Sequence, residues 1–362
     1  MQGYPPVNLD HLRTLTDQTG VIQHAIYSIP NRKTGYTTDD NARALMVALC
    51  HVDRFNDPVG HALVRIYLAF LHYAQNEDGK LRNFMNYDQN FMDREGSEDC
   101  FGRSFQACGR TLTSIVHPNI KRTALHLIER ALPWVDMLHS PRAQAYTIIG
   151  LCDYHRYAPD NPLTVQHARR LADNLTALYE KQSDPQWRWF EPILTYCNGS
   201  LPAGLFTAAE LTGEQQYRQV AEESLAFLAE VVMPHDRLEL VGSDGWYPRG
   251  GVKAPFDQQP VDADSFLSAC VAAYQLTGTQ HYRDWALTAF DWFLGRNVHG
   301  LPLYDPATGG CYDGLTPEGV NQNQGAESTL AFLSAQLTVI SALGPPAHMA
   351  PEHKESEQTT QQ

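Results

Sequence analysis

The sequence predicts an all-α protein, an (α/α)6 toroid in which six inner helices alternate with six outer helices. Three observations lead to this prediction. Helix signals dominate along the 362 residues, and strong strand signals are few. Segments with a one-sided apolar stripe alternate with segments that are apolar nearly all round. The latter recur about every 60 residues, which is longer than a solenoid repeat and leaves a long loop before each of them.

Two segments whose starts lie 65 residues apart share one pattern: LTGEQQYRQVAEESLAFL from Leu211 and LTGTQHYRDWALTAFDWFL from Leu276. Each indicates a helix that ends before a glycine, then a turn and an amphipathic helix. Gly213 and Gly278 suit the left-handed position that follows a helix end. In the second copy the apolar residues at helical spacing are Tyr282, Trp285, Ala286, Ala289, Phe290 and Phe293. They predict an outer helix packed on one face.

The same reasoning assigns the remaining elements. Outer helices are expected over 7–25, 58–75, 119–139, 162–182, 214–232 and 279–294. Inner helices are expected to start near Thr38, Glu98, Ser140, Asn198, Asp262 and Gln324. Stretches such as ALMVALCHV and SFLSACVAAYQL are apolar all round, which predicts burial on all sides. We therefore expect one ring-shaped catalytic domain over 1–345 and a disordered polar tail over 346–362.

Composition narrows the possible partners. The chain has 27 Lys and Arg against 41 Asp and Glu, a net charge of −14, and no basic run. Nucleic-acid binding needs clustered cations, so a nucleic-acid partner is not expected. The sequence shows no uninterrupted apolar run of membrane-spanning length and no signal-peptide pattern at its start. Seven cysteines without a CxxC motif are typical of reduced, buried thiols. We expect a cytoplasmic protein without a membrane partner, and the oligomeric state stays open.

Polar residues gather where each long loop meets an inner helix. In a toroid these six junctions converge at one end of the ring, around a central cleft. Any one of Thr38, Asp39 or Ser140 is explained by helix capping alone. Capping does not require adjacent acids with Asn and Arg, so the clusters together indicate a polar pocket. They lie at 35–43, 97–103, 140–144, 187–191 with 196–198, 256–264 and 321–327.

Two arginines in these clusters allow two interpretations. Arg43 and Arg103 each follow an acid, Asp39 and Asp99, by four residues. Each pair can form an ordinary ion pair along one helix. Alternatively, each arginine orients a carboxylate or contacts a ligand.

The tryptophans divide by position. Trp134, Trp285 and Trp292 fall on outer-helix stripes and are expected in the core. The three in loops ahead of inner helices are Trp187, Trp189 and Trp246. Beside carboxylates and amides they are typical of a carbohydrate site, since a sugar offers an apolar face to a ring. The alternative is that they anchor the loops by packing.

Paired carboxylates in one cleft fit glycoside hydrolysis, which needs a protonated acid and an ionised partner. The catalytic candidates are Asp39, Asp40 and Glu327, then Glu98, Asp99 and Asp262. The substrate-binding candidates are Arg43, Arg103, Arg142, Trp187, Trp189, Glu191, Tyr196, Asn198, Trp246, Gln258, Gln259, Asp264, Asn323 and Gln324. We find no HExxH, no ligand-spaced Cys/His set, no GxGxxG and no P-loop, so neither a metal nor a cofactor is expected.

The helix count and loop placement resemble the six-hairpin glycosidase superfamily over residues 5–345. The segment WFLGRN at 292–297 is similar to the LGRN segment of family 9 endoglucanases, although their DAGD segment is absent. That resemblance implies a base at Asp39 or Asp40 and an acid at Glu327. The segments GYTTDDNARAL, FDQQPVDA and NQNQGAEST look closer to an uncharacterised bacterial six-hairpin family. That likeness points to mannosides.

The resulting hypothesis is an intracellular glycoside hydrolase that cleaves an oligosaccharide, with inversion as most of the superfamily implies. A first alternative is a sugar epimerase of the acylglucosamine 2-epimerase type. That chemistry typically uses histidines at inner-helix ends, and only His235 and His299 are loop candidates. A second alternative is a non-catalytic glycan-binding protein, although a pure binder gains little from unpaired carboxylates.

Overall fold

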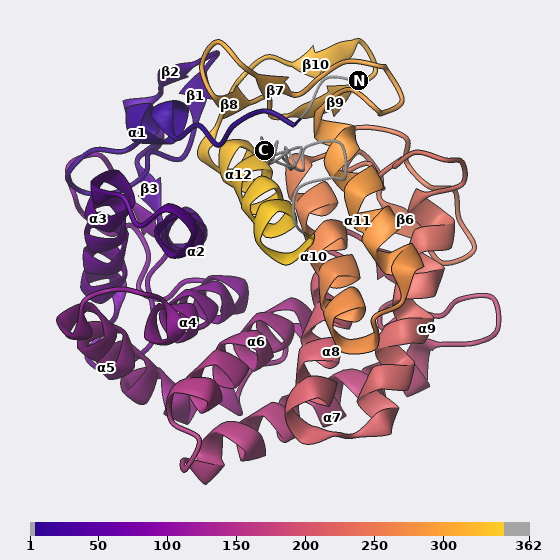
Figure 1. Cartoon of the computed structure of the whole chain (residues 1–362), viewed down its shortest axis with the longest axis horizontal. Coiled ribbons are helices and arrows are strands. Elements are labelled where there is room, and N and C mark those ends of the chain that lie inside the picture. The colour runs from indigo at the N-terminus through magenta and orange to yellow at the C-terminus, as the bar shows by residue number, and fades with distance from the viewer. Residues whose placement is uncertain (1–3, 344–362) are drawn as a thin grey trace, which may run out of the picture.

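The computed structural model describes residues 4–343, and these form a closed ring of helices (Figure 1). Each inner helix packs against the next one along the chain, and the last closes the ring on the first. The inner helices are α2 (Thr38–Phe55), α4 (Glu98–Thr113), α6 (Pro141–Tyr157), α8 (Ser200–Thr212), α10 (Pro260–Thr277) and α12 (Ala326–Thr338). The predicted (α/α)6 toroid is confirmed.

Five outer helices pack against the inner helices that precede them in the chain. They are α3 (Pro58–Ala74), α5 (Pro118–Val135), α7 (Pro162–Gln182), α9 (Gln215–Val232) and α11 (Gln280–Phe293). On α11 the buried side chains form the predicted one-sided stripe, although Trp285 is only half-buried. Gly213 and Gly278 end their helices with φ of 73° and 70°, as predicted.

The sixth outer helix is much shorter than predicted. Instead of a helix over 7–25, only α1 (Asp10–Leu15) is present, and it contacts α12. The helix stops because the Asp17 carboxylate accepts hydrogen bonds from the N–H groups of Thr19 and Gly20 and folds a turn. A Cβ at Gly20 would lie 2.5 Å from Asn41 Oδ1, so the chain passes too close to α2 for a larger residue.

Short strand pairs tie the long loops together. The pair that matters most for the cleft joins β3 (Tyr36–Thr37) to β4 (Phe84–Met85), with Thr37 opposite Phe84. The other pairs are β1 (Ala25–Ile26) with β2 (Ile29–Pro30), β5 (Ile193–Leu194) with β6 (Tyr247–Pro248), β7 (Tyr304–Asp305) with β8 (Gly310–Cys311), and β9 (Gly314–Thr316) with β10 (Gly319–Asn321).

Small residues let neighbouring inner helices approach closely. A Cβ at Gly109 of α4 would lie 2.4 Å from the carbonyl oxygen of Gly150 on α6. Gly102 of α4 faces the backbone of Ala143 on α6 in the same way, at 2.7 Å. The Gly- and Ala-rich composition of the inner helices therefore sets the diameter of the ring.

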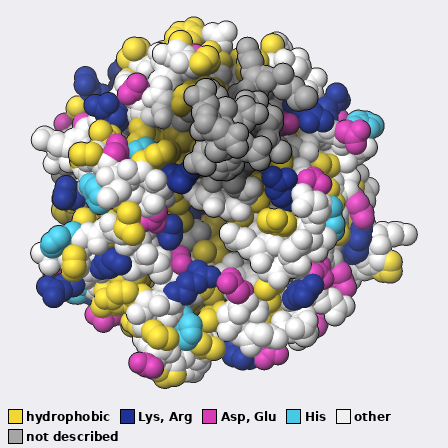
Figure 2. Space-filling view, in the orientation of Figure 1, with side chains coloured by type: hydrophobic (Ala, Val, Ile, Leu, Met, Phe, Trp, Pro, Cys, Tyr) yellow, Lys and Arg dark blue, Asp and Glu magenta, His cyan; other side chains and the backbone are white. Residues whose placement is uncertain are grey.

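Three further findings bear on the expectations from composition. Within the described chain, one helical stretch, 326–343, is long and apolar enough to cross a membrane, and 67% of it is buried in the ring, as in a core helix. All seven cysteines are free, and six of them are buried. On the face shown in Figure 2, acidic and basic side chains intermingle around the ring. The expected tail over 346–362 lies outside the described residues.

Candidate active site

The N-terminal ends of inner helices α2, α4 and α12 surround a cavity of about 300 Å³. Each inner helix begins where a long loop enters the ring, so side chains from the first turns of these helices lie around the cavity. Thr37 caps α2 by accepting the N–H of Asp40, and Ser97 and Ser140 cap α4 and α6. The cavity is lined by Gln23, His24, Thr37, Asp39, Asp40, Arg43, Asn83, Phe84, Ser97, Asp99, Arg103, Tyr196 and Glu327.

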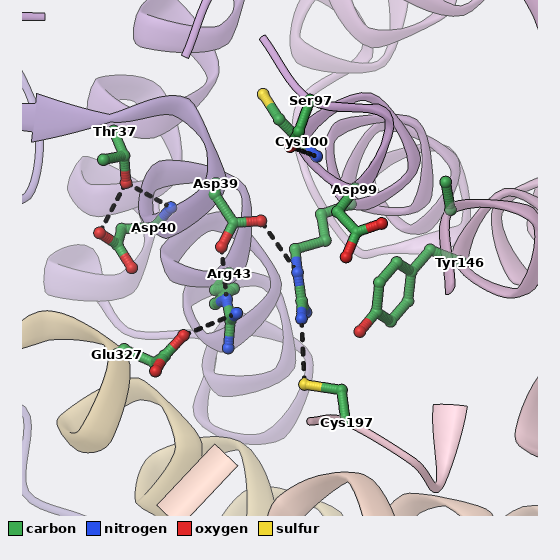
Figure 3. Close-up of polar contacts among 12 residues, drawn as sticks. Thr37, Asp39, Asp40, Arg43, Ser97, Asp99, Cys100, Tyr146, Cys197 and Glu327 are labelled. Carbon is green, nitrogen blue, oxygen red and sulfur yellow. Dashed lines mark hydrogen bonds and ion pairs between the residues drawn. The ribbon is translucent and has the colours of Figure 1, made fainter. Parts of the chain in front are cut away.

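Asp39 is held between two arginines (Figure 3). Its Oδ2 accepts a hydrogen bond from Arg43 Nε at 3.1 Å, the i,i+4 pair predicted from the sequence. Its Oδ1 lies 2.9 Å from Arg103 Nε, an ion pair between helices that lacks hydrogen-bond alignment. Burial alone raises the pKa of Asp39, but the two guanidinium groups outweigh it and hold that pKa below its usual range. Asp39 is therefore ionised, with both oxygens engaged.

The arginines link this carboxylate to the rest of the ring. Arg43 Nη2 lies 2.9 Å from Glu327 Oε2 and so joins α2 to α12. The Arg103 guanidinium stacks 4.2 Å above the Tyr146 ring and contacts Cys197 Sγ at 3.3 Å. The two guanidinium groups thus contact two of the four acidic side chains that line the cleft, Asp39 and Glu327.

Asp40 has a very different environment from its neighbour. The Thr37 hydroxyl donates to Asp40 Oδ2 at 2.6 Å, and no arginine pairs with this carboxyl among the described residues. Burial, together with the nearby charges of Asp39 and Glu327, raises the pKa of Asp40 to about 7. Adjacent acids in the sequence thus form one ionised group and one that shares its population between the protonated and ionised forms near neutral pH.

Glu327 completes the acidic wall. It extends from the first turn of α12, and 45% of its side chain is exposed to the cavity space. Figure 3 shows Asp40 and Glu327 on the same side of the Arg43 guanidinium. The predicted proximity of Asp39, Asp40 and Glu327 across the seam between the first and last inner helices is therefore present in the structure.

Two other buried acids belong to α10 and point elsewhere. Asp262 accepts the Cys197 N–H at 2.5 Å beneath the cleft, and burial raises its pKa to about 7. Asp264 lines a cavity of about 190 Å³ between the inner helices, which shares Arg43 and Arg103 with the cleft. Burial also raises the pKa of Asp264 to about 7. Asp264 was predicted to bind substrate, and it lies in this cavity and not in the cleft lining, so its role in binding stays a prediction.

The acids of α4 have separate tasks. Glu98, a predicted catalytic candidate, accepts the N–H groups of His139 and Ser140 and fixes the start of α6 outside the cleft. Asp99 lines the cleft and accepts hydrogen bonds from Ser140 Oγ at 2.6 Å and from the Tyr196 hydroxyl at 2.8 Å. Arg103 does not pair with Asp99, as the i,i+4 spacing suggested, but with Asp39 on the neighbouring helix.

Several predicted ligand contacts instead hold one loop in place. Arg142 is buried and donates to the Tyr196 carbonyl at 2.6 Å, to Glu191 at 2.9 Å and to Thr195 Oγ1 at 2.7 Å. Asn198 accepts the Thr195 N–H within the same loop. Arg142, Glu191 and Asn198 therefore fix the loop that presents Tyr196, and none of the three is among the residues that line the cleft.

The tryptophan prediction is wrong for two residues. Trp187 and Trp189 are 3% and 0% exposed and pack edge-on against Phe227 and Phe190. The loop folds back on the outer helices, which buries both rings away from any ligand. Trp246 is half-buried and its ring lies 6.4 Å from that of Tyr196, so it borders the cleft without lining it.

The amide candidates also divide. Gln258 is buried and bonds to Leu240, Trp292 and the Pro255 carbonyl, and buried Gln324 bonds to Thr308 and Asp305. Both are structural, which corrects their predicted role in binding. Asn323 accepts the Tyr27 N–H at the rim. Gln259 alone of the four faces a cavity, one that adjoins the cleft at Glu327.

The structure adds four lining residues that the sequence did not single out: Gln23, His24, Asn83 and Phe84. His24 and Phe84 come from the loop before β1 and from β4. Both are remote from the helix-start clusters that guided the prediction. Phe84 gave little signal in the sequence, and the pairing of Thr37 with Phe84 ties its strand to the start of α2, so that Phe84 and Asp40 line one cavity.

Among residues 4–343, no group of three or more His, Cys, Asp or Glu side chains is placed to hold a metal ion. The cleft offers two carboxylates paired with arginines, Asp39 and Glu327. A third, Asp99, accepts hydrogen bonds from Ser140 and Tyr196, and the carboxyl group of Asp40 has a raised pKa. Such groups can transfer protons and form hydrogen bonds with a polar ligand.

Solved structures with a similar fold include enzymes named for their action on sugars. No family model matches the chain, and no curated protein matches it either. Solved structures do match. D-mannose isomerase has a TM-score of 0.67 at 13% identity, covering 91% of this chain and 94% of that one. Cellobiose 2-epimerase from Bacillus thermoamylovorans B4167 has a TM-score of 0.68 at 12% identity, covering 91% and 95%.

The GH76A α-1,6-mannanase from Salegentibacter sp. HEL1_6 is also similar, with a TM-score of 0.61 at 12% identity over 91% of this chain and 95% of that one. Its inactive variant, with two consecutive aspartates changed to asparagine, is known in complex with α-1,6-mannotriose (TM-score 0.58, 12% identity, the same coverage). At such low identities these likenesses establish the fold alone. It is an (α/α)6 toroid.

Proposed function

We propose that this protein is a glycoside hydrolase that cleaves an uncharged oligosaccharide, with Asp40 as the acid and Glu327 as the base. One observation carries the proposal. Two carboxyl groups from adjacent inner helices, one without an arginine partner and one bound to Arg43, line the same cavity. Two-carboxylate hydrolysis requires such a pair of unlike acids.

Asp40 suits the role of proton donor. Its pKa is raised to about 7 by burial and by its acidic neighbours, so near neutral pH much of it holds a proton. The Thr37 hydroxyl occupies Oδ2, which leaves Oδ1 to give that proton to the glycosidic oxygen. The bond between this oxygen and the anomeric carbon breaks as the proton arrives.

Glu327 suits the role of base. Its Oε2 lies 2.9 Å from Arg43 Nη2, and 45% of its side chain is exposed, so water can reach it. In this reaction a water molecule attacks the anomeric carbon and gives its proton to Glu327. The assignment reverses the one that family resemblance implied, because the arginine lies beside Glu327 and not beside Asp40.

Asp39 and the two arginines act as a positioning layer. Both oxygens of Asp39 contact a guanidinium group, so it is a poor nucleophile in this arrangement. Its negative charge also helps to keep Asp40 protonated. A variant of the GH76A mannanase with two consecutive aspartates changed to asparagine is inactive, which supports a role for the consecutive aspartates here. Because that variant binds α-1,6-mannotriose, mannosides are the first substrates to test.

Amide substitutions test the proposal. Asp40→Asn and Glu327→Gln should each lower kcat on a cleaved mannooligosaccharide by about 10²- to 10⁴-fold, the usual contribution of a general acid or base. Glu77→Gln, at an exposed position outside the cleft lining, is the matched control and should retain activity. Near-wild-type turnover by both cleft variants would refute the assignment.

A sugar 2-epimerase is the second candidate, and His24 favours it. Epimerisation needs a group that removes and returns a proton beside the carbonyl, a common task for histidine. His24 lies in the cleft wall beside Glu327. A His24→Asn variant separates the two functions: it should abolish epimerisation, whereas hydrolysis by Asp40 and Glu327 should survive.

A further inference from the structure

The cleft continues past Glu327 into a second cavity of about 240 Å³. The two cavities share exactly two lining side chains, His24 and Glu327, which stand where they meet. The first, which we call the aromatic compartment, contains Phe84 and Tyr196. The second, the polar compartment, is lined by Ser243, Asp257, Gln259, Asp313, Thr316 and Asn321, among others.

The sizes of the compartments indicate how much ligand they hold. Sites for small molecules usually occupy roughly 300–1,000 Å³. Neither compartment alone extends far into that range, at about 300 and 240 Å³. Together they lie well inside it. A ligand that fills the whole site therefore reaches from one compartment to the other and passes Glu327.

Phe84 gives the first compartment a fixed apolar surface. Its side chain is 51% exposed, although its backbone is held on both sides. Phe84 pairs with Thr37 across the β3–β4 strands, and its N–H donates to Asp93 Oδ1 at 3.0 Å. An exposed aromatic ring on a rigid backbone, inside a cleft, is typical of a surface that a ligand covers.

Tyr196 faces the same compartment and is also fixed. Its hydroxyl donates to Asp99 Oδ2 at 2.8 Å, and its ring lies 4.5 Å from the Arg142 guanidinium carbon. The tyrosine thus presents an oriented ring with its polar end satisfied. Two such rings suit the apolar face of one sugar unit.

The polar compartment has the opposite character. Its side chains offer neutral hydroxyl and amide groups from Ser243, Gln259, Thr316 and Asn321, and carboxylates from Asp257 and Asp313. Of the described residues that line it, none is a lysine or an arginine. Such a surface accepts hydrogen bonds from sugar hydroxyls and repels an anionic sugar.

We propose that the cleft binds two consecutive units of an uncharged oligosaccharide, one against Phe84 and Tyr196 and the next in the polar compartment. The bond between the units lies at Glu327. The smallest full substrate is then a neutral disaccharide, and Phe84 and Asn321 govern recognition of the two different units. The position of the scissile bond rests on the proposed function, whereas the length and charge of the ligand rest on the cavities alone.

Binding measurements with the Asp40→Asn variant test this without turnover. The probes are a panel of neutral disaccharides that includes α-1,6-mannobiose and cellobiose, the monosaccharides mannose and glucose, and digalacturonate as an anionic dimer. The tightest neutral disaccharide should bind at least tenfold more strongly than its monosaccharide, by calorimetry or NMR titration. Digalacturonate should bind at least tenfold more weakly than that disaccharide.

Second-site variants locate the two units. Phe84→Ala should weaken both monosaccharide and disaccharide binding at least fivefold, whereas Asn321→Ala should weaken only the disaccharide. Tyr157→Ala and Gln219→Ala, at exposed positions away from the cleft, are the controls and should change neither affinity. Equal affinity for one and two units, preference for the anionic dimer, or no binding by any neutral disaccharide would overturn the inference.

The outcome is separable from that of the proposed function. A protein that binds disaccharides in this length-dependent way but never cleaves them refutes hydrolysis and keeps the two-unit site. A protein that cleaves an aryl monosaccharide yet shows no gain from a second unit keeps hydrolysis and loses the two-unit site.

Discussion

At the scale of single residues, neighbouring acids in the sequence acquire opposite properties in the ring. Asp39 lies between Arg43 and Arg103, whereas Asp40 is buried against Thr37. The DDNAR pattern indicated that acids and an arginine meet here, and the i,i+4 spacing predicted the contact between Asp39 and Arg43. It could not predict that Arg103 crosses from α4 to Asp39, because that contact depends on how two inner helices pack.

The first residue-level prediction concerns the alkaline limb of the pH–rate profile. Activity should fall as pH rises through about 7, because Asp40 then loses the proton it must donate. Asp39→Asn removes a negative charge that raises the pKa of Asp40 and releases two guanidinium groups that stabilise its anion. The alkaline limb of the variant should therefore move to lower pH in kcat/KM profiles. A limb that stays in place or moves upward would show that Asp40 is not the titrating acid.

The second concerns Asp264 and stability. Burial raises its pKa in the folded protein to about 7, above the ordinary value of 3.8. The folded state then binds more protons than the unfolded state between these values, so this group makes stability fall as pH rises from about 4 to 7. The loss persists above pH 7. The Asp264→Asn variant should lack this loss. Its free energy of unfolding relative to wild type should therefore be up to about 3 kcal/mol more favourable at pH 8 than at pH 5.

Urea unfolding of both proteins at the two pH values measures this difference. Glu77→Gln, which removes an exposed acid of similar charge, serves as the control and should show the same offset at pH 5 and pH 8. If the stability difference between Asp264→Asn and wild type is the same at pH 5 and pH 8, the pKa of Asp264 is not raised in the folded protein.

At the scale of elements, the periodic pattern predicted most helices because burial dictates composition. The inner helices start within two residues of their predicted positions, and the outer helices from α3 to α11 are all present. Helices apolar all round are buried all round, so that part of the fold was readable. The end of the N-terminal helix was not, because the apolar spacing over 7–25 does not show that the Asp17 side chain folds a turn onto Thr19 and Gly20.

Loop conformation was the least readable level. Polar and aromatic residues in a loop can face a ligand, the core or each other, and the letters alone do not distinguish these outcomes. Trp187 and Trp189 are buried in the core, whereas Phe84 and Tyr196 line the cleft. The strand pairs between loops decided this, and two-residue strands leave almost no sequence signal.

The glycine contact between α4 and α6 gives the element-level prediction. Gly109→Ala should raise helix propensity by about 1 kcal/mol. Its Cβ would nonetheless lie 2.4 Å from the Gly150 carbonyl oxygen, so the two backbones must separate. We expect a net loss of about 1–3 kcal/mol in the free energy of unfolding, measured by urea titration.

Gly278→Ala offers a comparison, since its Cβ would meet nothing within 4 Å and only the positive φ opposes it. Activity should also fall in Gly109→Ala more than in Gly278→Ala, because α4 carries Asp99 and Arg103 into the cleft. A Gly109→Ala protein as stable as wild type would contradict the close packing of these helices.

At the scale of the whole molecule, ring closure creates the site. Asp40 and Glu327 are 287 residues apart in the sequence and meet only because α12 packs against α2. The toroid was predictable from the repeat length, and its closure implied this meeting. The expectation of one domain over 1–345 stays a prediction, as does the chemistry that the closed ring supports.

Carbohydrate chemistry on this fold takes at least two forms, hydrolysis and epimerisation, as the isomerase, epimerase and mannanase neighbours illustrate. The arrangement of Asp40, Glu327 and Arg43 favours hydrolysis, whereas His24 is the feature that favours epimerisation. The two reactions leave different marks on the sugar. Hydrolysis breaks the glycosidic bond and leaves C2 untouched, whereas epimerisation keeps the bond and exchanges the hydrogen at C2.

Proton NMR of neutral mannobiose and cellobiose incubated with the protein in D₂O therefore tests the central claim most directly. We predict release of monosaccharide, a newly formed anomer of inverted configuration, no deuterium at C2, and loss of this activity in Asp40→Asn and Glu327→Gln. Deuterium at C2 of an intact disaccharide, or cleavage that persists in both variants, would contradict the account.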